Sequence, residues 1–367
     1  MNKKIFLLAI IFCTLTFAGN PKLPKNIIIM IGDGMGVSQV SLSVITNPNS
    51  VYKEFPITGF SITCSADKLK TDSAAGGTAI ACGESTNNGS IGVDKRGESI
   101  PSIFDLAKQK KLSTGIVVTC DITNATPAAF LSHTPDRRKS ELIAEQIATS
   151  ETDIIIGGGK QFFIPESLGG KRKDKNNLLD NLKLKGYKVF DTYNELNNSG
   201  SKKYFALFED EDLKAAEKRY YSLATLTQKA LEGLSHNEHG FVLMVEGSQI
   251  DHGGHENNQQ YLINELNDFE RAVKTAFNFA KSNKETLVLV TADHETGGVA
   301  ITGGDVGGEN IKVDFASKSH TATMVGVFAY GPQSEIFSGI NENYKLGRKL
   351  FKLLSDNHFS KSTETTK

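Results

Sequence analysis

Six short runs of the chain are continuously apolar, without a polar residue at every second position. A strand that is covered by helices on both faces shows this pattern, whereas a strand with one exposed face alternates. The segment 60–64, Phe-Ser-Ile-Thr-Cys, does alternate, and it predicts an edge or half-exposed strand. The runs predicted to be buried strands are 26–31, 114–118, 153–156, 241–245, 286–290 and 324–329.

Amphipathic segments lie between these runs. After Asn258, apolar residues recur at helical spacing, while Asn, Glu, Lys and Arg occupy the other positions. The apolar positions are Leu262, Leu266, Phe269, Val273, Ala276, Phe277 and Ala280. Segments 102–111, 140–150, 222–235 and 343–355 show the same pattern and are also predicted to be helices. Because buried strands alternate with helices, we predict an α/β fold, a three-layer α/β/α sandwich with a central, largely parallel sheet.

The two ends of the chain differ from the predicted domain. Residues 1–19 have a short basic start and an apolar run that closes on small residues, which is typical of a secretory signal peptide. The alternative is a retained N-terminal anchor, for which the apolar run is short. We therefore expect a periplasmic or secreted protein with no membrane contact in its mature form. Residues 20–358 are expected to form a single catalytic domain with a lysine-rich surface excursion near 164–220, and residues 359–367 a polar tail.

Composition and charge narrow the class of partner. The 367 residues are 39% hydrophobic and 23% charged, which is enough for a large core. The net charge is −1 with histidine neutral, and acidic and basic residues are interspersed, so nothing marks a surface for nucleic acid or anionic membrane. Small-molecule substrates are favoured. Beyond Cys13 in the predicted signal peptide, Cys64, Cys82 and Cys120 allow at most one internal disulfide, and no catalytic role is expected for them.

Acidic residues follow three of the predicted buried strands. Asp33 comes after the run 26–31, Glu246 after 241–245, and Asp293, with His294 beside it, after 286–290. In an open α/β sheet, ligands bind at the carboxyl ends of the strands, where loops converge. One acid in such a place is usually a helix cap or a turn residue. Three carboxylates in one crowded site need cations to neutralise them.

Histidines and a further carboxylate could complete such cation sites. Asp251 and His255 are four residues apart, so a turn of helix would place both side chains on one face. Sets of this kind suit Zn²⁺, while Glu246 with hydroxyl and carboxylate oxygens would suit the harder Mg²⁺. A lone histidine is more often structural. Four of the eight histidines, however, lie next to Asp, Gly, Ser or Thr rather than in apolar runs, namely His252, His255, His294 and His320.

Ser73 stands beside Asp72 at the start of a predicted helix of small residues, Ser-Ala-Ala-Gly-Gly-Thr-Ala. Thr, Asp and Ser are also preferred helix caps, and taken alone the pattern favours a cap over a nucleophile. A serine at a helix N-terminus would nevertheless face free N–H groups and the positive end of the helix dipole, which suits a phosphate. Further along, Arg137 either begins a surface helix or offers a guanidinium for bidentate phosphate recognition.

Taken together, these motifs resemble the alkaline phosphatase family. The resemblance runs from about residue 26 to the end of the chain. Its motifs, in the family's order, are Asp33, Thr-Asp-Ser73, Thr126-Pro, Glu246 with Asp251 and His255, Asp293-His294 and His320-Thr321. The resemblance implies an enzyme that hydrolyses phosphate monoesters to inorganic phosphate and an alcohol at alkaline pH. It also implies a phosphoserine intermediate on Ser73, two zinc ions and one magnesium ion.

The resemblance further implies roles for single residues. Ser73 would join the second zinc site during the reaction, and Arg137, eleven residues after Thr126 as in the family, would bind phosphate oxygens. The implied ligands are Asp251, His255 and His320 for the first zinc, Asp33, Asp293 and His294 for the second, and Asp33, Thr126 and Glu246 for magnesium. Asp33 would therefore bridge two of the metal sites.

The chain departs from common family patterns at three places. Asn124, two residues before Thr126, is acidic in many bacterial members and a histidine in animal ones. His252 resembles the animal enzymes, where many bacterial ones have a lysine. Both positions bear on the third metal and on phosphate release. Only 25 residues separate His294 from His320, where many members carry a longer insertion used in dimer contacts, so a monomer and a homodimer both stay open.

Two other functions are compatible with the motifs. The first is another enzyme of the same metal-dependent superfamily, a phosphodiesterase or a phosphate-transferring mutase, although these generally place a lone Thr or Ser nucleophile in a different local context. The second is a secreted metal- or phosphate-binding protein without turnover, for which Ser73 would not be needed. A comparison of monoester and diester hydrolysis separates the first, and absence of activity with zinc and magnesium would favour the second.

Overall fold

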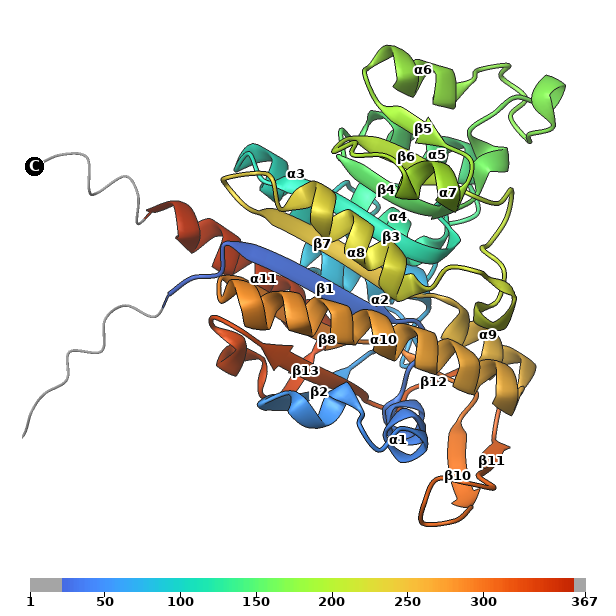
Figure 1. The fold of residues 1–367 in the computed structure, drawn as a ribbon, viewed down its shortest axis with the longest axis vertical. Coiled ribbons are helices and arrows are strands. Elements are labelled where there is room, and N and C mark those ends of the chain that lie inside the picture. The colour runs from blue at the N-terminus through green and yellow to red at the C-terminus, as the bar shows by residue number, and fades with distance from the viewer. Residues whose placement is uncertain (1–21, 360–367) are drawn as a thin grey trace, which may run out of the picture.

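A ten-stranded sheet forms the centre of the computed structural model, which describes residues 22–359 (Figure 1). The predicted signal peptide, 1–19, and residues 360–367 of the predicted tail lie outside the described residues. β13 runs antiparallel to both of its neighbours, and all other neighbouring strands of this sheet are parallel. In sheet order the strands are β14 (Gly339–Glu342), β2 (Ile57–Ile62), β13 (Val325–Tyr330), β8 (Thr286–Thr291), β1 (Asn26–Gly32), β7 (Phe241–Gly247), β3 (Ser113–Asp121), β4 (Ile154–Gly158), β6 (Tyr204–Leu207) and β5 (Lys188–Phe190).

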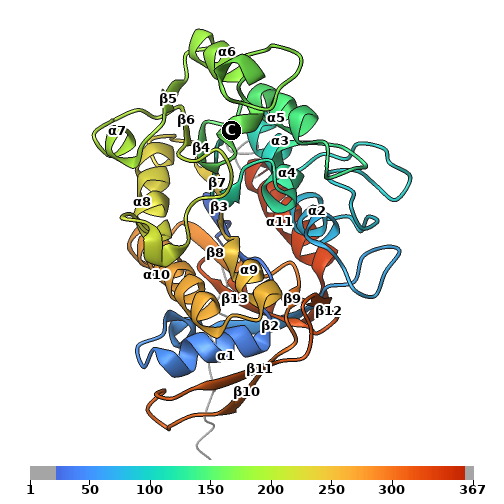
Figure 2. The same ribbon diagram turned by 90° about the vertical axis from the view of Figure 1, so that its right-hand side faces the viewer.

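Helices cover both faces of the sheet, and the view along its edge shows the resulting layers (Figure 2). One layer contains α1 (Val37–Thr46), α8 (Leu223–Leu234) and α10 (Gln259–Asn283). The opposite layer contains α2 (Ser73–Cys82), α3 (Ile103–Gln109), α4 (Ala125–Leu131), α5 (Ser140–Thr149) and α11 (Asn343–Phe359). The predicted three-layer α/β/α sandwich with a largely parallel sheet is thereby confirmed.

The continuous apolarity of the central strands has a direct structural cause. In β1, Ile27, Ile29 and Ile31 pack into the core on one side of the sheet, while Ile28 and Met30 pack into the core on the other. Successive side chains of a strand point to opposite faces, so a strand with helices on both sides needs apolar residues at every position. The central strands are therefore fixed rigidly, and they define the edge at which the site is built.

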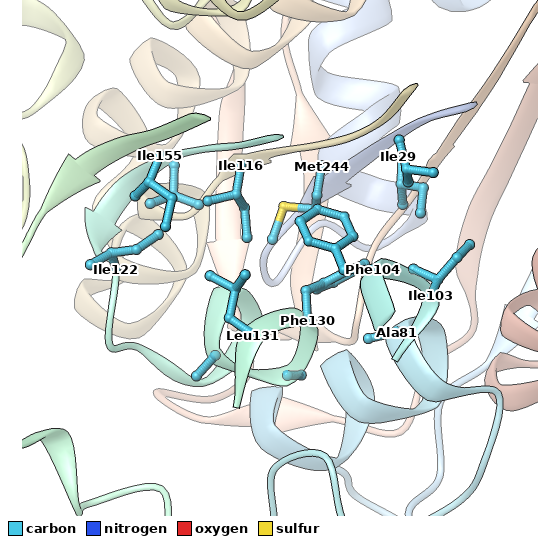
Figure 3. Close-up of a cluster of buried hydrophobic side chains, with 14 of the residues drawn as sticks. Ile29, Ala81, Ile103, Phe104, Ile116, Ile122, Phe130, Leu131, Ile155 and Met244 are labelled. Carbon is cyan, nitrogen blue, oxygen red and sulfur yellow. The ribbon is translucent and has the colours of Figure 1, made fainter. Parts of the chain in front are cut away.

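Aromatic side chains fill the core between the sheet and the layer that holds α2, α3 and α4. Figure 3 shows Ile116 and Met244 from the sheet above Phe104 of α3 and Phe130 of α4. The two phenylalanine rings meet edge to face, with centroids 5.4 Å apart, which is a favoured geometry for aromatic pairs. This packing anchors α3 and α4 to the sheet, and α4 carries Thr126 at its first turn.

Smaller elements lie at the rim of the sandwich. β9 (Glu295–Thr296) pairs with β12 (His320–Thr321), and β10 (Val299–Gly303) forms a hairpin with β11 (Lys312–Phe315) that projects from the body (Figures 1 and 2). The remaining α-helices of the described chain are α6 (Leu178–Leu184), α7 (Tyr193–Asn197) and α9 (Gln249–Glu256). Short 3₁₀ helices are η1 (Val51–Glu54), η2 (Lys160–Phe162), η3 (Glu166–Leu168), η4 (Ala216–Lys218) and η5 (Ser334–Phe337).

Each predicted strand coincides with a strand of the sheet, and each predicted helix with a helix. The segment 60–64 overlaps β2, which lies between β14 and β13 and is half-exposed. Its exposure alternates, but the apolar Phe60 and Ile62 are on the exposed side and Ser61 is buried. The sequence did not predict α1 or α4. It treated 164–220 as a surface excursion, whereas β5 and β6 of this segment pair along the edge of the main sheet. Within residues 22–359, no helix combines the length and the hydrophobicity that crossing a membrane requires.

Candidate active site

Three carboxylates meet at the carboxyl edge of the central strands, as the sequence predicted. β1 lies between β7 and β8, and Ile31 near its end pairs with Glu246 of β7 and with Thr291 at the end of β8. Asp33 follows β1 directly, and Asp293 is the second residue after β8. The three acids are buried, with exposed fractions of 6% for Asp33, 1% for Glu246 and 0% for Asp293. The parallel register of three neighbouring strands therefore concentrates negative charge in one buried place.

Ser73 is the first residue of α2, but it does not cap the helix. The cap is Asp72, whose Oδ1 accepts a hydrogen bond from the backbone N–H of Ala75 at 3.0 Å. The Ser73 hydroxyl is thereby left for another use, and its Oγ lies 3.2 Å from Nε2 of His294. Ser73 is almost fully buried, at the positive end of the helix dipole. The structure thus separates the two interpretations of this turn, because the neighbouring residue does the capping.

Two groups of side chains in the described chain have ligand atoms that all lie within 4.8 Å of one another. One consists of Asp33, Asp293 and His294, which are the residues predicted to hold the second zinc. Nε2 of His294 lies 3.4 Å from Oδ1 of Asp33 and 3.2 Å from Oδ2 of Asp293. The other group consists of Asp251, His294 and His320. His294 belongs to both groups, and its ring stacks on that of His320 with centroids 3.5 Å apart.

His255, predicted to share the first zinc with Asp251 and His320, lies at the edge of the second group. Its Nε2 is 3.3 Å from Oδ2 of Asp251, and its ring centroid is 5.1 Å from that of His320. Asp251 and His255 do lie on one face of a helix, α9, as their spacing indicated. The structure therefore brings all three predicted ligands of the first zinc together. His294, which is predicted to bind the second zinc, also lies close to Asp251.

The three histidines direct the same ring atom, Nε2, toward the acids and the hydroxyl of the site. Nδ1 of His255 lies 2.8 Å from the carbonyl oxygen of Lys318, and Nδ1 of His320 lies 2.9 Å from that of Thr71. Because a carbonyl only accepts hydrogen bonds, each Nδ1 must carry the proton. Nδ1 of His294 lies 3.2 Å from the hydroxyl of Thr296, which itself donates to Asp251 at 2.5 Å. In the neutral rings, Nε2 therefore has a lone pair that can bind a metal ion.

Buried oxygen atoms at this edge lack hydrogen-bond partners among the described residues. They are Oδ1 of Asp33, Oγ1 of Thr126, Oε1 of Glu246 and Oδ2 of Asp293. Buried polar atoms are normally satisfied, so four orphaned oxygens in one place need an explanation. They belong to the predicted ligands of magnesium and of the second zinc. The donor set of oxygen atoms and imidazole nitrogens fits hard and borderline divalent cations.

Without cations, the crowding of buried carboxylates raises the pKa values of the acids in the site. Burial and the charge of Asp293 raise the pKa of Glu246 to about 8, and burial with the charge of Asp251 raises the pKa of Asp293 to about 7. Burial and neighbouring carboxylates also raise the pKa of Asp33 well above its usual range. A positive charge in the site would reverse these shifts, because it stabilises the ionised carboxylates.

The pKa values of Asp251 and of the histidines beside it do not all shift upward. Burial pushes the pKa of Asp251 upward, but its hydrogen bond with His255 and the nearby histidines outweigh this, so the pKa lies below its usual range. Hydrogen bonding to Asp251 raises the pKa of His255 to about 9. Burial, followed by the neighbouring ring of His320, lowers the pKa of His294 well below its usual value. His294 is thus neutral at physiological pH, the form that binds metal ions.

Arg137 reaches the same place from the loop between α4 and α5. Its Nη1 lies 3.2 Å from Oδ2 of Asp72, and its Nη2 donates to Oδ1 of Asn124 at 3.2 Å. These contacts fix the guanidinium beside the turn that carries Ser73. Arg137 also borders a surface pocket of about 340 Å³, together with Asn124 and Asp212. Of its two predicted roles, a surface helix start and a phosphate ligand, the position favours the second.

Several residues that orient the site were not found from the sequence. Asp72 was known only as a neighbour of Ser73, and its ion pair with Arg137 joins segments 65 residues apart. Thr296 and Glu295 follow His294 directly, yet their partners lie in α9, α1 and β12, so nothing in the local pattern marked them. Cys120, given no catalytic role, places its Sγ 3.7 Å from Oε2 of Glu246. Cys64, Cys82 and Cys120 are free thiols in the described structure.

Residues 24–314 match the family model described as alkaline phosphatase. Alkaline phosphatase 3 of Bacillus subtilis (strain 168) is 32% identical, with 92% of this chain and 91% of the relative covered. Alkaline phosphatase 4 of the same organism is 38% identical over 76% of this chain, and the chain spans 62% of that relative's length. The alkaline phosphatase of Escherichia coli (strain K12) is 30% identical, with 88% of this chain and 84% of the relative covered.

Solved structures agree with the sequence comparisons. The alkaline phosphatase from the Antarctic bacterium TAB5 superimposes with a TM-score of 0.84 and 38% identity, with 91% of this chain and 99% of that chain covered. A histidine-to-aspartate variant of the TAB5 enzyme has Mg bound in its M3 site. Family model, full-length relatives and structures all agree, and the chain belongs to the alkaline phosphatase family, a family of metal-dependent phosphomonoester hydrolases.

Proposed function

We propose that this protein hydrolyses phosphate monoesters to inorganic phosphate and an alcohol at alkaline pH, through a phosphoserine intermediate on Ser73. One observation carries the proposal. Ser73 has a buried hydroxyl that does not cap its helix, and its Oγ lies 3.2 Å from His294, the residue shared by both ligand groups. A protein that only bound metal or phosphate would have no need of a hydroxyl in this position.

We assign two zinc ions and one magnesium ion to the site. The ligands would be Asp251, His255 and His320 for the first zinc, Asp33, Asp293 and His294 for the second, and Asp33, Thr126 and Glu246 for magnesium. The orphaned oxygens and the Nε2 atoms that face the acids support this donor set, and the Mg in the TAB5 variant supports a magnesium site. When bound, the cations would supply positive charge that favours the serine alkoxide, the leaving alcohol and the attacking water.

The residues of the chain account for the remaining parts of the mechanism. The Ser73 oxygen attacks phosphorus, the ester P–O bond breaks, and the alcohol leaves. Water then attacks the phosphoserine, releasing phosphate and restoring the hydroxyl, so the net reaction consumes one water molecule. Arg137 binds equatorial phosphate oxygens through its guanidinium, and the free N–H groups at the start of α2 face the same phosphate. Asp72 and Asn124 hold Arg137 in place for this contact.

Metal analysis combined with a phosphomonoesterase assay tests the proposal most directly. We expect the purified protein to contain zinc and magnesium, to hydrolyse a phosphate monoester at alkaline pH, and to lose activity to a chelator. A strong preference for a diester would instead support a phosphodiesterase of the same superfamily. Absence of hydrolysis with both metals present would support a binding protein.

Location and partners follow from the sequence features described above. We propose a periplasmic or secreted enzyme that acts on small phosphomonoesters, with no specific nucleic-acid partner and no membrane contact in its mature form. Both a monomer and a homodimer are compatible with the short segment between His294 and His320. Sedimentation of the purified protein would decide between them.

A further inference from the structure

Glu295, directly after His294, has no assigned role in the site, yet its carboxylate is buried among contacts that connect the metal-binding histidines. We infer that Glu295 is a positioning residue that locks β9 to β12 and so fixes His294 and His320 relative to each other. The inference rests on the proposed metal-dependent function. It concerns a residue that binds neither substrate nor metal, and it acts through the residues that do.

The Glu295 carboxylate is fully used as a hydrogen-bond acceptor. Oε1 accepts from the side-chain amide of Gln39 at 2.9 Å and from the backbone N–H of Val299 at 3.1 Å. Oε2 accepts from the backbone N–H of Gly298 at 3.2 Å and from the hydroxyl of Thr321. The residue is only 3% exposed. These donors therefore replace the water that an ionised carboxylate would otherwise need.

No lysine, arginine or histidine of residues 22–359 forms an ion pair with Glu295. A buried carboxylate without a cation is costly unless its hydrogen bonds are complete. The four donors come from α1, from the turn after β9 together with the first residue of β10, and from β12. The carboxylate keeps all four hydrogen bonds only while these three segments keep their positions, and this gives the contacts a strict geometry.

The pairing of β9 with β12 is too short to be stable without help. It consists of two residue pairs, His320 with Thr296 and Thr321 with Glu295. Isolated strand pairs of ordinary length are already marginal in water, and 23 residues, 297–319, separate these two strands. The bond between Glu295 and the Thr321 hydroxyl adds a side-chain contact to the backbone pairing at the same position. It thereby fixes the backbone that carries His320.

Gln39 extends the arrangement to the other side of the site. Its amide also donates to the carbonyl oxygen of Thr296 at 2.8 Å, so α1 is attached to both residues of β9. A Cβ atom added to Gly36, just before α1, would lie only 2.2 Å from Cγ of Glu295. The segment after β1, which carries Asp33, therefore approaches Glu295 closely. The segment after β1, the segment after β9 and the strand β12 therefore all contact one carboxylate.

Metal affinity depends on such outer contacts. Residues that orient metal ligands typically change metal affinity by about 10- to 100-fold when they are altered, because the ligands lose their fixed geometry. Loss of the Glu295–Thr321 contact would let β12 move relative to β9. The zinc ion assigned to Asp251, His255 and His320 should then bind more weakly, while the fold, held by the ten-stranded sheet, stays intact.

A matched set of variants tests this inference on the full-length protein. Thr321→Val removes the hydroxyl while keeping the shape, and Thr321→Ser keeps the hydroxyl. Glu295→Gln replaces one of the two acceptor oxygens with an NH₂ group, which then faces hydrogen-bond donors. Glu309→Gln is the control, because it makes the same change on the exposed hairpin. The zinc dissociation constant of the metal-free protein is measured by competition with a chelator of known affinity, and kcat and KM are measured with a phosphate monoester.

We expect Thr321→Val and Glu295→Gln to weaken zinc binding by about 10- to 100-fold. At subsaturating zinc, both should lower kcat more than they raise KM. Thr321→Ser should recover wild-type zinc affinity, and Glu309→Gln should not alter it. The double variant Glu295→Gln/Thr321→Val should bind zinc as tightly as the single variant that has the lower zinc affinity, because both substitutions remove the same contact.

Two outcomes would overturn the inference, and they are distinguishable. If the wild type binds zinc and hydrolyses the monoester, but Thr321→Val and Glu295→Gln bind zinc as tightly as it does, Glu295 has only a structural role and the proposed function stands. If the wild type itself neither binds zinc nor hydrolyses the monoester, the inference fails together with the proposed function. If Glu295→Gln only lowers the thermal stability, this does not support the inference. The zinc affinities of Thr321→Val and Thr321→Ser then decide.

Discussion

Ser73 and the side chains around it divide the work of the site among single residues. Asp72 caps α2 and holds Arg137, which leaves the Ser73 hydroxyl free. His294 presents Nε2 to both ligand groups, because the hydroxyl oxygen of Thr296 accepts a hydrogen bond from its other ring nitrogen, Nδ1. Each role depends on a neighbour that occupies the competing hydrogen bond. Substitutions at this scale should therefore separate metal binding, phosphate binding and chemistry.

Ser73→Ala is expected to abolish phosphoenzyme formation and to lower kcat by about 10³-fold or more, because the attacking oxygen is lost. Zinc and magnesium content should stay at wild-type levels, since the proposed protein ligands are unchanged. Trapping with a ³²P-labelled monoester after an acid quench measures the first effect, and elemental analysis the second. Ser282→Ala, on the surface of α10, serves as the control. A parallel loss of zinc and activity would instead point to collapse of the site.

Arg137→Ala should weaken the binding of inorganic phosphate, a product inhibitor, by about 10- to 100-fold, the range expected for one charge-assisted contact. Arg137→Lys should recover only part of this affinity, because an ammonium group cannot donate two parallel hydrogen bonds to a phosphate. Inhibition constants for phosphate at fixed pH measure both variants. Arg138→Ala, whose guanidinium is exposed and paired with Asp136, is the matched control. Equal inhibition constants for all four proteins would remove Arg137 from the phosphate site.

The sequence predicted which residues lie in the site better than it predicted the contacts between them. Asp33, Glu246 and Asp293 could be placed together because each follows a buried strand, and parallel strands end at one edge. The choice of Asp72, rather than Thr71 or Ser73, as the cap, the sharing of His294 and the contacts of Glu295 could not be predicted. They depend on side-chain geometry between segments that are far apart in the chain, and no local pattern records such contacts.

Helix α2 brings Ser73, the proposed nucleophile, to the sheet edge, and its first turn contributes both to stability and to the proposed site. Asp72→Ala should lower the free energy of unfolding by about 1 kcal/mol, because the N–H of Ala75 loses its cap. Asp72→Asn should restore most of this stability, since an amide oxygen can still accept that hydrogen bond. Urea unfolding of the two variants measures the difference. Equal destabilisation by both changes would contradict the capping role and assign the effect to the ion pair with Arg137.

Element prediction succeeded where burial imposes a strong pattern and failed where it does not. β1, β7 and β8 are covered on both faces, and α10 has a regular apolar stripe, so their segments could be recognised. β9 and β12 have two residues each, which is too short for any periodicity. β5 has three residues and β6, although it is fully buried, has only four, so neither apolar run stands out within the lysine-rich segment.

The whole molecule should respond to pH through its buried carboxylates when no metal is bound. In the folded, metal-free protein, the pKa is about 7 for Asp293, about 8 for Glu246 and about 9 for His255. All three values are raised above those of the unfolded chain, so the folded state binds more protons between pH 6.5 and 9. The free energy of unfolding must therefore fall as pH rises through this window. His294 and His320, whose pKa values are lowered, oppose this only below about pH 6.5.

Thermal unfolding in a chelator at pH 6.5 and at pH 9 measures this effect. We expect a lower melting temperature at pH 9 without metals, and a smaller decrease with zinc and magnesium, because the cations replace the protons. Glu246→Gln should also reduce the decrease, since one titrating carboxyl is gone. A melting temperature of the metal-free protein that rises between the two pH values would contradict the prediction.

The short pairing of β9 with β12 also bears on how the molecule can change in evolution. This pairing joins the two ends of the segment that carries the β10–β11 hairpin, and the contact between Glu295 and Thr321 stabilises the junction. The ends of the segment are thus fixed independently of its length, and lengthening a closed loop costs little additional entropy. The hairpin can therefore acquire new chain, or even a small inserted module, without moving His294 or His320. A family that varies at this point can diversify its surroundings while its chemistry stays constant.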